Sequence, residues 1–411
     1  MRILVSGVNY APEVTGIGPY TTALAEHLAH QGHDVVVATT FPFAPSWRWF
    51  ESPPRWRTRE RMDGVDVWRT KVVLPRRLTA TSRIVFDSSI GFTSALTTLS
   101  IPRVDVAICL SPPIQTTLAA AIVRFKMRKL VVFVQDLPTE AARSVGILKE
   151  GPALSVGRSL EHLAYRLADH VVVIANAFRK YIEGVGVNPG KISEIPNWAD
   201  VESIRPQRPD QVMRERLGAS RSDFLVVHAG NMGAKQDLLN VVAAAAALQE
   251  DSHIKFALIG DGQHRDRVSG EIAARHLSNI RVMPLRANDE FSAVLGAADA
   301  LLVNQAPMVV DSVLPSKLLA YMASERPVVV SAHLKSTTAD LVRTSGCGVV
   351  AHPGQPDALA AAIRAMASAD PLSTELATMA TRGRAYVEEH FGRASILKRW
   401  DVLLADLAGT S

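Results

Sequence analysis

The feature that most constrains this chain is an alternation between short apolar runs and longer amphipathic segments. In the first half, we expect strands at residues 3–6, 35–39, 65–70, 106–110, 130–134 and 171–174, where Val and Ile are frequent. Amphipathic segments such as 21–31 and 160–168 lie between these runs. Largely apolar strands that alternate with helices are typical of a parallel sheet covered by helices on both faces.

The alternation begins again after a segment rich in Pro, Arg and Asp at residues 197–210. The next expected strands are 224–227, 255–259, 280–283, 300–303, 328–330 and 349–351. A chain of 411 residues is too long for one ordinary core. We therefore expect an α/β fold with two doubly wound Rossmann-like domains facing a cleft, and ligands at the carboxyl ends of the strands. The expected boundaries are 1–195 for the N-terminal domain, 196–381 for the C-terminal domain, and 382–411 for a helix that crosses back to the first domain.

Composition excludes several classes of protein. Hydrophobic residues make up 47% of the chain, which indicates a globular protein, and the apolar runs at 130–134 and 241–248 fall well below the roughly 18 residues of a membrane span. Cys109 and Cys347 lie in apolar contexts, which favours buried thiols in a reducing cytosol. The net charge of +5 favours a phosphorylated molecule or an anionic membrane as partner, because motifs for nucleic-acid binding are missing. The first residues indicate a strand rather than a signal peptide, so we expect a cytoplasmic protein.

A glycine-containing loop follows the first expected strand. Residues 9–20 (NYAPEVTGIGPY) place Gly16 and Gly18 directly before a helix. Glycine lets the backbone approach a ligand closely, and free N–H groups at a helix start attract anions. The loop lacks the GxGxxG pattern, and no acidic residue ends the second strand, which disfavours a dinucleotide dehydrogenase. A plain turn between a strand and a helix explains this loop equally well.

Two further loops follow strands of the second half. The first holds Gly230, Asn231, Gly233 and Lys235, and the second holds Gly260 and Asp261. A lysine at a helix start opposes the helix dipole, so Lys235 favours a bound anion. An ordinary turn accounts for Gly260 and Asp261 equally well.

The third candidate site combines Pro315, Ser316 and Lys317 at the start of a helix. A second lysine in this position strengthens a diphosphate-binding interpretation of both lysines. Ser316 has an alternative role as a helix N-cap. The chain contains no Asp-x-Asp sequence, a common arrangement for holding a divalent ion on a sugar nucleotide. We therefore expect no metal and no cofactor, with lysines and helix N-termini stabilising the departing diphosphate.

Taken together, these segments resemble the retaining glycosyltransferases of the GT-B fold, family four. The matching pieces span nearly the whole chain and are NYAPEVTGIGPY (9–20), FVQDLPTEAARSVGIL (133–148), IPNWAD (195–200), HAGNMGAKQ (228–236), LIGDGQ (258–263) and LPSKLLAYMA (314–323). The branch that they resemble is that of fucosyl and N-acetylfucosaminyl transferases of colanic-acid and O-antigen synthesis. Each piece is common by itself, and the specificity comes from their combination and order.

The resemblance implies roles for individual residues. Gly16 and Gly18 would face the donor phosphates, and Lys235 and Lys317 would hold the diphosphate. Gln135 and Asp136, which follow the strand at 130–134, would lie near the acceptor or the transferred sugar. Asp136 is then first a positioning residue and second a candidate base, and its alternative is to cap the following helix.

The chain also departs from the family pattern. Family members commonly carry two glutamates eight positions apart, the second of which binds the nucleotide ribose. The corresponding positions are Ser312 and Ala320 here, with Asp311 beside the first. Asn231 stands where the family often has arginine. These departures leave the ribose contact unassigned.

The expected activity is transfer of a sugar from a nucleotide diphosphate sugar to an acceptor hydroxyl, with retention, in cell-surface polysaccharide or glycoconjugate synthesis. Same-face attack assisted by the leaving phosphate is the mechanism that the resemblance implies. Two alternatives remain open, a sugar-nucleotide epimerase on the same fold and a non-catalytic partner of a glycan assembly complex. The second alternative is motivated by the missing glutamate at Ala320.

Residues 46–61 form an unusual segment. Trp47, Trp49, Phe50 and Trp56 are interleaved there with five arginines. Aromatic rings favour the membrane interface and arginine is attracted to anionic lipids, so we expect a peripheral contact with the inner face of the membrane or with a lipid-linked acceptor. The alternative is a folded loop that packs its tryptophans on the first domain.

Overall fold

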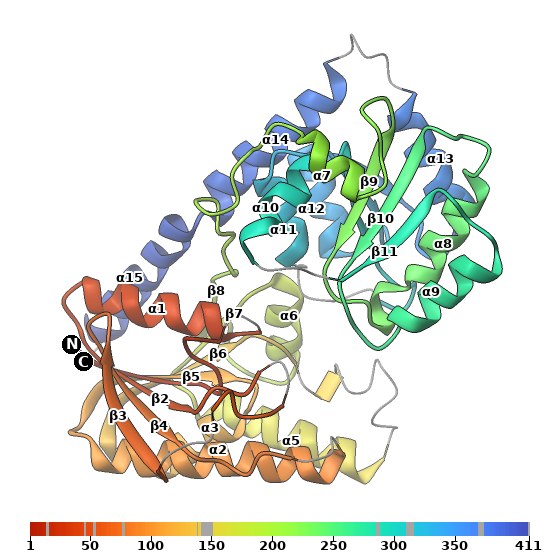
Figure 1. The fold of residues 1–411 in the computed structure, drawn as a ribbon. Coiled ribbons are helices and arrows are strands. Elements are labelled where there is room, and N and C mark those ends of the chain that lie inside the picture. Colours follow the sequence, from red (N-terminus) through yellow and green to blue (C-terminus); the bar gives the residue numbers. More distant parts are fainter. Residues whose placement is uncertain are drawn as a thin grey trace. The chain divides into compact units, whose positions relative to one another are not determined.

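The computed structural model describes residues 1–13, 16–44, 47–51, 55–75, 79–137, 139–140, 151–284, 288–309, 316–368 and 374–409. The chain divides into two compact units (Figure 1). Unit 1 comprises Met1–Asn197 and Leu397–Ser411, and unit 2 comprises Trp198–Ile396. Each unit has its own sheet of mainly parallel strands with helices around it, which confirms the predicted α/β fold of two parallel-sheet domains.

The sheet of unit 1 has eight strands in the order β3-β4-β2-β1-β5-β6-β7-β8. The strands are β1 (Arg2–Ser6), β2 (Asp34–Thr40), β3 (Arg57–Met62), β4 (Val65–Thr70), β5 (Val104–Ser111), β6 (Met127–Val134), β7 (His170–Val173) and β8 (Ile192–Glu194). Neighbouring strands are parallel except β3 and β4, which pair antiparallel. This arrangement brings the carboxyl ends of the parallel strands to one edge of the sheet.

The edge strand β3 begins within the segment that we predicted as a loop at residues 46–61. Met62 pairs with Val65, so that only Asp63 and Gly64 form the turn. Both turn residues have positive φ, 45° for Asp63 and 83° for Gly64. Asp-Gly is a favoured sequence for a two-residue hairpin whose central residues both need positive φ. The hairpin signal is present in the sequence, and it converts the last part of the expected loop into a strand.

Helices cover both faces of the unit 1 sheet (Figure 1). They are α1 (Gly18–His30), α2 (Ala80–Ser100), α3 (Gln115–Ile122), α5 (Pro152–Leu167) and α6 (Asn176–Gly184), with 3-10 turns η1 (Arg124–Lys126) and η2 (Pro189–Lys191). Helix α1 lies on one face, and α2, α3 and α5 lie on the other. Residues of β1, β5 and α3 meet in one buried core that includes Leu4, Ala107 and Ala120.

The end of the chain forms two helices, α14 (Glu375–Phe391) and α15 (Arg393–Gly409), with Gly392 between them. A side chain at Gly392 would lie 2.6 Å from the carbonyl oxygen of Glu388, so the glycine permits the tight break. In unit 1, the buried ring of Trp400 on α15 contacts Phe133 of β6 at a centroid distance of 4.8 Å. Asp401 lies 2.9 Å from Nε2 of His27 on α1. The end of α15 is therefore part of the packing of unit 1.

The sheet of unit 2 has six parallel strands in the order β11-β10-β9-β12-β13-β14. The strands are β9 (Phe224–Ala229), β10 (Ile254–Ile259), β11 (Ile280–Met283), β12 (Ala300–Asn304), β13 (Val328–Ser331) and β14 (Gly348–Ala351). The helices are α7 (Gln211–Arg216), α8 (Leu238–Ala247), α9 (Arg265–Ala274), α10 (Asn288–Ala297), α11 (Ser316–Ala323), α12 (Thr337–Ser345) and α13 (Pro356–Ala367), with the 3-10 turn η3 (Ala234–Gln236). Successive residues of β9 join different cores, because Val226 packs with residues of α8 and α13 and Val227 packs with residues of α10 and α11.

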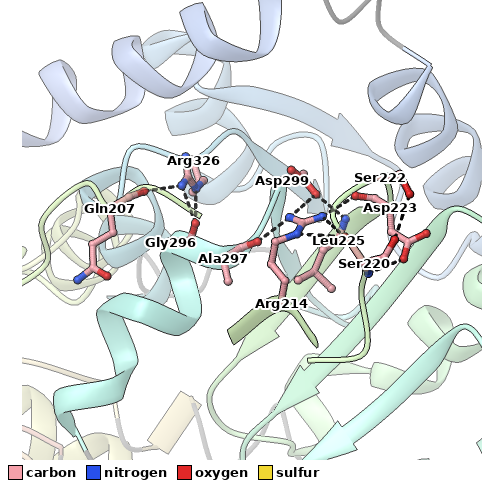
Figure 2. A network of polar contacts seen from close by, with 10 residues as sticks. All are labelled: Gln207, Arg214, Ser220, Ser222, Asp223, Leu225, Gly296, Ala297, Asp299 and Arg326. Carbon is pink, nitrogen blue, oxygen red and sulfur yellow. Dashed lines mark hydrogen bonds and ion pairs between the residues drawn. The ribbon is translucent and has the colours of Figure 1, made fainter. Parts of the chain in front are cut away.

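A buried arginine joins the segments that precede the unit 2 strands (Figure 2). The guanidinium of Arg214 donates to a carboxylate oxygen of Asp299 at 2.9 Å and to the carbonyl of Ala297 at 2.9 Å. The same side chain donates to the carbonyls of Ser220 and Asp223. Asp299 also accepts from the backbone N–H of Leu225 at 2.7 Å. This network stabilises the amino edge of the sheet, opposite the carboxyl edge where ligands bind in such folds.

Candidate functional site

The loops after β9 and β10 lie directly against each other at the carboxyl edge of the unit 2 sheet. The N–H of Gly230 donates to the carbonyl of Ile259 at 2.7 Å, and the N–H of Met232 donates to the carbonyl of Asp261 at 2.8 Å. A side chain at Gly260 would place its Cβ 1.8 Å from the carbonyl oxygen of Gly230. The two loops approach this closely because residue 260 is glycine.

Side-chain amides hold the first of these loops. Oε1 of Gln236 accepts from the N–H of Gly233 at 3.1 Å and from Nδ2 of Asn231 at 3.4 Å. Asn231 is exposed, and a Cβ at Gly262 of the neighbouring loop would lie 2.6 Å from its Oδ1. Asp261 is also exposed, and its carboxylate accepts from the N–H of Gly262 at 2.7 Å. The predicted residues of both loops thus form one compact platform.

Lys317 lies in the first turn of α11 and reaches back to the end of β9. Its Nζ lies 3.2 Å from Nε2 of His228, 89 positions away in the sequence. A Cβ at Gly230 would lie 3.1 Å from the same Nζ. The lack of a side chain at Gly230 therefore provides the space that the lysine occupies. The structure brings Lys317 together with the glycine loop after β9.

His228 holds Lys317 as a hydrogen-bond acceptor. Nδ1 of the fully buried imidazole lies 3.1 Å from the carbonyl oxygen of Leu302, so Nδ1 carries the proton and Nε2 accepts from the ammonium of Lys317. Burial, and then the charge of Lys317, lower the pKa of His228 to about 3. Burial lowers the pKa of Lys317 to about 8. A neutral imidazole therefore supports a half-buried cation, whose charged form a bound anion would stabilise.

Tyr321 fixes α11 against β9. Its hydroxyl accepts from the N–H of Ala229 at 2.8 Å and donates to the carbonyl of Ala229 at 3.1 Å. Tyr321 follows Lys317 by four positions, so both side chains lie on the same face of the helix. We did not predict His228 or Tyr321 from the sequence. The sequence offered two signals for them, a histidine near the end of an apolar strand and a tyrosine one helical turn after the lysine.

Lys235 has an exposed side chain on a firmly anchored backbone. It lies in the 3-10 turn η3 rather than in the first turn of α8, which begins at Leu238. Its carbonyl accepts from the N–H of Ala306 at 2.9 Å. Nδ2 of Asn304, at the end of β12, donates to the carbonyl of Gln236 at 2.8 Å. The backbone of the lysine is therefore held at the carboxyl edge of the sheet.

Some of the other residues that we predicted near Lys317 lie outside the described ranges. Asp311, Ser312 and Pro315 lie outside the described residues. Ser316 is exposed and is the first residue of α11, and Ala320 is half-buried on the same helix. The roles that we predicted for these positions stay predictions.

In unit 1, the first loop contacts the segment that follows β2. The buried carboxylate of Glu13 accepts from Nδ2 of Asn9 at 2.9 Å and from the backbone N–H groups of Phe43 at 2.9 Å and Ala44 at 2.7 Å. A Cβ at Gly18, the first residue of α1, would lie 2.7 Å from the carbonyl oxygen of Glu13. The carboxylate of Glu13, which we did not predict from the sequence, therefore links the predicted glycine loop to the rest of the unit.

The other predicted glycine of this loop, Gly16, has a φ of 63°, in the left-handed region that glycine adopts without strain. Val14 and Thr15, directly before it, lie outside the described residues. The structure thus places Gly16 in the loop after β1 and Gly18 at the first position of α1, at the carboxyl edge of the unit 1 sheet.

Gln135 and Asp136 follow β6 at the same edge. Gln135 forms a reciprocal amide pair with Asn197, with Nε2 of Gln135 3.0 Å from Oδ1 of Asn197 and Nδ2 of Asn197 2.8 Å from Oε1 of Gln135. Oδ1 of the half-buried Asp136 accepts from the N–H of Leu137 at 2.9 Å. Burial, joined by the charges of Glu140 and Asp136, raises the pKa of Glu161. The amide pair fixes Gln135, whereas Asp136 contributes negative charge to this part of unit 1.

The three tryptophans of the aromatic segment have different environments. Trp47 is half-buried, with ring centroids 5.3 Å from Phe43 and 5.2 Å from Phe86. Trp49 is also half-buried and lies 6.3 Å from Phe43. Trp56, in contrast, is 56% exposed. Packing on unit 1 therefore accounts for Trp47 and Trp49, and the predicted acceptor or membrane contact of all three stays a prediction.

Neither a membrane-spanning helix nor a cluster of metal ligands occurs among the described residues. Within these ranges, no helix is both long and apolar enough to cross a bilayer. The same ranges contain no group of three or more His, Cys, Asp or Glu side chains arranged to hold a metal ion. Metal independence nevertheless stays a prediction.

Comparison with known proteins assigns the family. Residues 15–198 match the family model of the glycosyl transferase 4-like domain, and residues 210–383 match that of the glycosyl transferases group 1. Over 373 residues, the chain is 29% identical to WcaI of Escherichia coli (strain K12), which is named as a colanic acid biosynthesis glycosyl transferase. That match covers 89% of this chain and 91% of WcaI.

Solved structures show the same fold at low sequence identity. Sucrose-phosphate synthase from Thermosynechococcus elongatus is similar over 100% of both chains, with a TM-score of 0.75 and 18% identity. HepE of Anabaena, solved in complex with UDP-glucose, is similar over 99% of this chain and 100% of its own, with a TM-score of 0.69 and 17% identity. The two family models, one on each half of the chain, show that it is a glycosyltransferase with a 4-like domain followed by a group 1 domain. The solved structures show the GT-B fold.

Proposed function

We propose that this protein transfers a sugar from a nucleotide diphosphate sugar to an acceptor hydroxyl during polysaccharide or glycoconjugate synthesis. Family membership supports glycosyl transfer, and the similarity to WcaI supports the polysaccharide context. The HepE complex with UDP-glucose supports a nucleotide sugar as donor. A fucosyl or N-acetylfucosaminyl group is the transferred sugar that the resemblance of the motifs favours.

The observation that carries this proposal is the contact between Lys317 and His228 beside Gly230. An ammonium group has three donors, and one of them is directed to Nε2 of His228. The other donors of Lys317 can then meet phosphate oxygens at the carboxyl edge of the sheet. A cation that is positioned before the reaction stabilises the charge that develops on a departing diphosphate. Lys235 would add a second cation from the neighbouring turn.

In the proposed mechanism, the acceptor hydroxyl attacks the anomeric carbon on the face from which the diphosphate leaves. The bond from that carbon to the phosphate oxygen breaks as the new glycosidic bond forms, and the leaving phosphate oxygen takes the hydroxyl proton. The product then retains the anomeric configuration. Gln135 and Asp136 would position the acceptor or the sugar, and no dedicated protein base is required.

The proposal also includes catalysis without a divalent ion. Lys317 and Lys235 would supply the positive charge that a metal supplies in other transferases, so we expect activity to survive EDTA. Activity of the purified protein would be measured with and without the chelator. Complete loss with EDTA, restored by magnesium or manganese, would contradict this part of the proposal.

The central test is a donor screen that measures release of the nucleotide diphosphate and the anomeric configuration of the product by NMR. We expect release that depends on an acceptor, and a product with the donor's anomeric configuration. Lys317→Met should slow release by roughly 30- to 1000-fold, whereas Lys335→Met, at an exposed position, should not change it. Conversion of the donor without an acceptor would instead indicate an epimerase. Lack of turnover of any donor by the purified chain would indicate a non-catalytic partner.

A further inference from the structure

Exposed apolar side chains gather on one layer of unit 1. Of the seventeen large apolar residues that are exposed in the described ranges, ten belong to α2, α3, η1 and α5 or to the residues that join them. These ten residues are Ile84, Val85, Phe92, Leu99, Ile122, Phe125, Val156, Leu160, Leu163 and Leu167, and we call them the apolar face. Scattered single residues of this kind are normal on a protein surface, but a concentrated group indicates an interaction site.

Their spacing places them on single sides of the helices. Val85, Phe92 and Leu99 recur every seven residues along α2, and the four residues of α5 follow each other at intervals of three or four. Both spacings keep side chains on one side of an α-helix. The other sides are apolar too, because Phe86 of α2 and Tyr165 of α5 are buried. Each of these helices therefore has one apolar side in the core and a second one in solvent.

The three helices form one surface. Helix α3 packs against α2 and against α5, and all three cover the same face of the sheet (Figure 1). The end of α3 and the following turn contribute Ile122, which is 81% exposed, and Phe125, which is 69% exposed. The apolar face is therefore spread over neighbouring helices rather than confined to a single element.

The exposed charge on these elements is positive. Their two carboxylates are withdrawn, since Asp87 is half-buried and accepts from Arg83 at 3.0 Å, and Glu161 is buried. Two cations contact backbone carbonyls, with Lys126 donating to Ile101 and Arg166 donating to Val185. Hydrogen bonds to carbonyls leave the charge of these two side chains uncompensated. The elements of the apolar face thus carry cations but no exposed carboxylate.

We propose that the apolar face docks this enzyme on the surface of a bilayer that contains anionic lipids. Apolar side chains would enter the boundary between headgroups and acyl chains, and Lys126 and Arg166 would lie against lipid phosphates. A second copy of the chain is a less suitable occupant, because two positively charged faces repel each other. This surface differs from residues 46–61, where Trp47 and Trp49 pack inward. The proposal rests on the proposed function in one respect only: docking on the bilayer would place the transferase beside a lipid-linked acceptor.

The test is co-sedimentation of the full chain with vesicles, without donor or acceptor, so that its outcome does not depend on catalytic activity. Vesicles of phosphatidylcholine alone are compared with vesicles that also contain phosphatidylglycerol, at low and high salt. The main variant combines Phe92→Gln, Ile122→Gln and Leu163→Gln, one substitution on each helix. A matched control combines Val212→Gln and Val402→Gln, which replace residues of similar exposure on α7 and α15. Circular dichroism and the thermal midpoint verify that every variant is folded.

We expect the wild type and the control to bind anionic vesicles, with binding weakened by salt. The triple variant should lose affinity by a factor on the order of ten or more, because three apolar contacts with the bilayer are removed. Trp56→Gln should bind like the wild type. Wild-type protein that stays in the supernatant at low salt would overturn the proposal, as would a folded triple variant that binds normally. Self-association of the wild type that the triple variant lacks, without vesicle binding, would instead show a contact between copies and also overturn it.

Discussion

Raising the pH from 7 to 9 is expected to weaken the binding of a nucleoside diphosphate, with UDP as the probe, through the deprotonation of Lys317. Burial lowers the pKa of this lysine to about 8 in the free protein. About nine tenths of the protein then carries the ammonium form at pH 7 and about one tenth carries it at pH 9. A bound diphosphate favours the ammonium form and raises the pKa in the complex.

If binding requires the charged lysine, the Kd for UDP should increase about tenfold between pH 7 and 9. This change corresponds to about 1.4 kcal/mol of binding free energy. The phosphates of UDP do not contribute to this change, because a phosphate ester loses its second proton near pH 6. Isothermal titration calorimetry at constant ionic strength measures the change directly.

Lys317→Met is the decisive control, because methionine is similar in length and carries no charge. This variant should bind UDP weakly at pH 7 and should lack the additional tenfold loss at pH 9. Lys335→Met should behave like the wild type. The reasoning is refuted if the Kd of the wild type changes less than twofold between pH 7 and 9, or if Lys317→Met retains the full pH dependence.

Three further predictions concern the same edge of unit 2. Lys235→Ala and Lys317→Ala should each cost on the order of 2–4 kcal/mol of transition-state stabilisation in steady-state kinetics, and a wild-type turnover number in either variant would place the phosphate site elsewhere. Because the pKa of His228 is lowered from 6.5 to about 3, the unfolded chain binds a proton that the folded chain does not; the free energy of unfolding should therefore fall by about 1.4 kcal/mol per pH unit below pH 6.5. Urea denaturation should show this additional slope in the wild type but not in His228→Gln, and equal slopes would disprove it. Gly260→Ala should destabilise unit 2 by on the order of 3 kcal/mol, because its Cβ would lie 1.8 Å from the carbonyl oxygen of Gly230. The control Gly270→Ala has open space around its Cβ, so its urea midpoint should equal or exceed that of the wild type.

Local sequence patterns were sufficient for the architecture. Apolar runs such as 130–134 and 328–330 predicted strands, and the structure contains them as β6 and β13. The hairpin between β3 and β4 was missed although Asp63 and Gly64 signal it, because the aromatic and arginine-rich composition before it suggested a loop. Strands and turns can be predicted from such patterns because their preferences depend on residues that are neighbours in the sequence.

Sequence patterns predicted the residues of the candidate site only in part. Glycines and lysines after strands could be identified as phosphate-binding candidates, since the carboxyl ends of parallel strands meet at one edge. The partner of Lys317 could not be identified, because His228 lies 89 positions away and becomes its neighbour only when β9 and α11 pack together. Glu13 was overlooked for the same reason, as its hydrogen bonds reach the segment after β2.

The sequence by itself determined the fold class, the family resemblance and the positions of the glycine loops, because these depend on local periodicity and on short motifs. Tertiary structure alone decided which groups act on one another. It made His228 a buried neutral acceptor and lowered the pKa of Lys317, since burial depends on the complete surroundings of a side chain. It also showed that α2 and α5 expose an apolar side, because their periodicity predicts an amphipathic helix but does not tell how much of the apolar surface the core can cover.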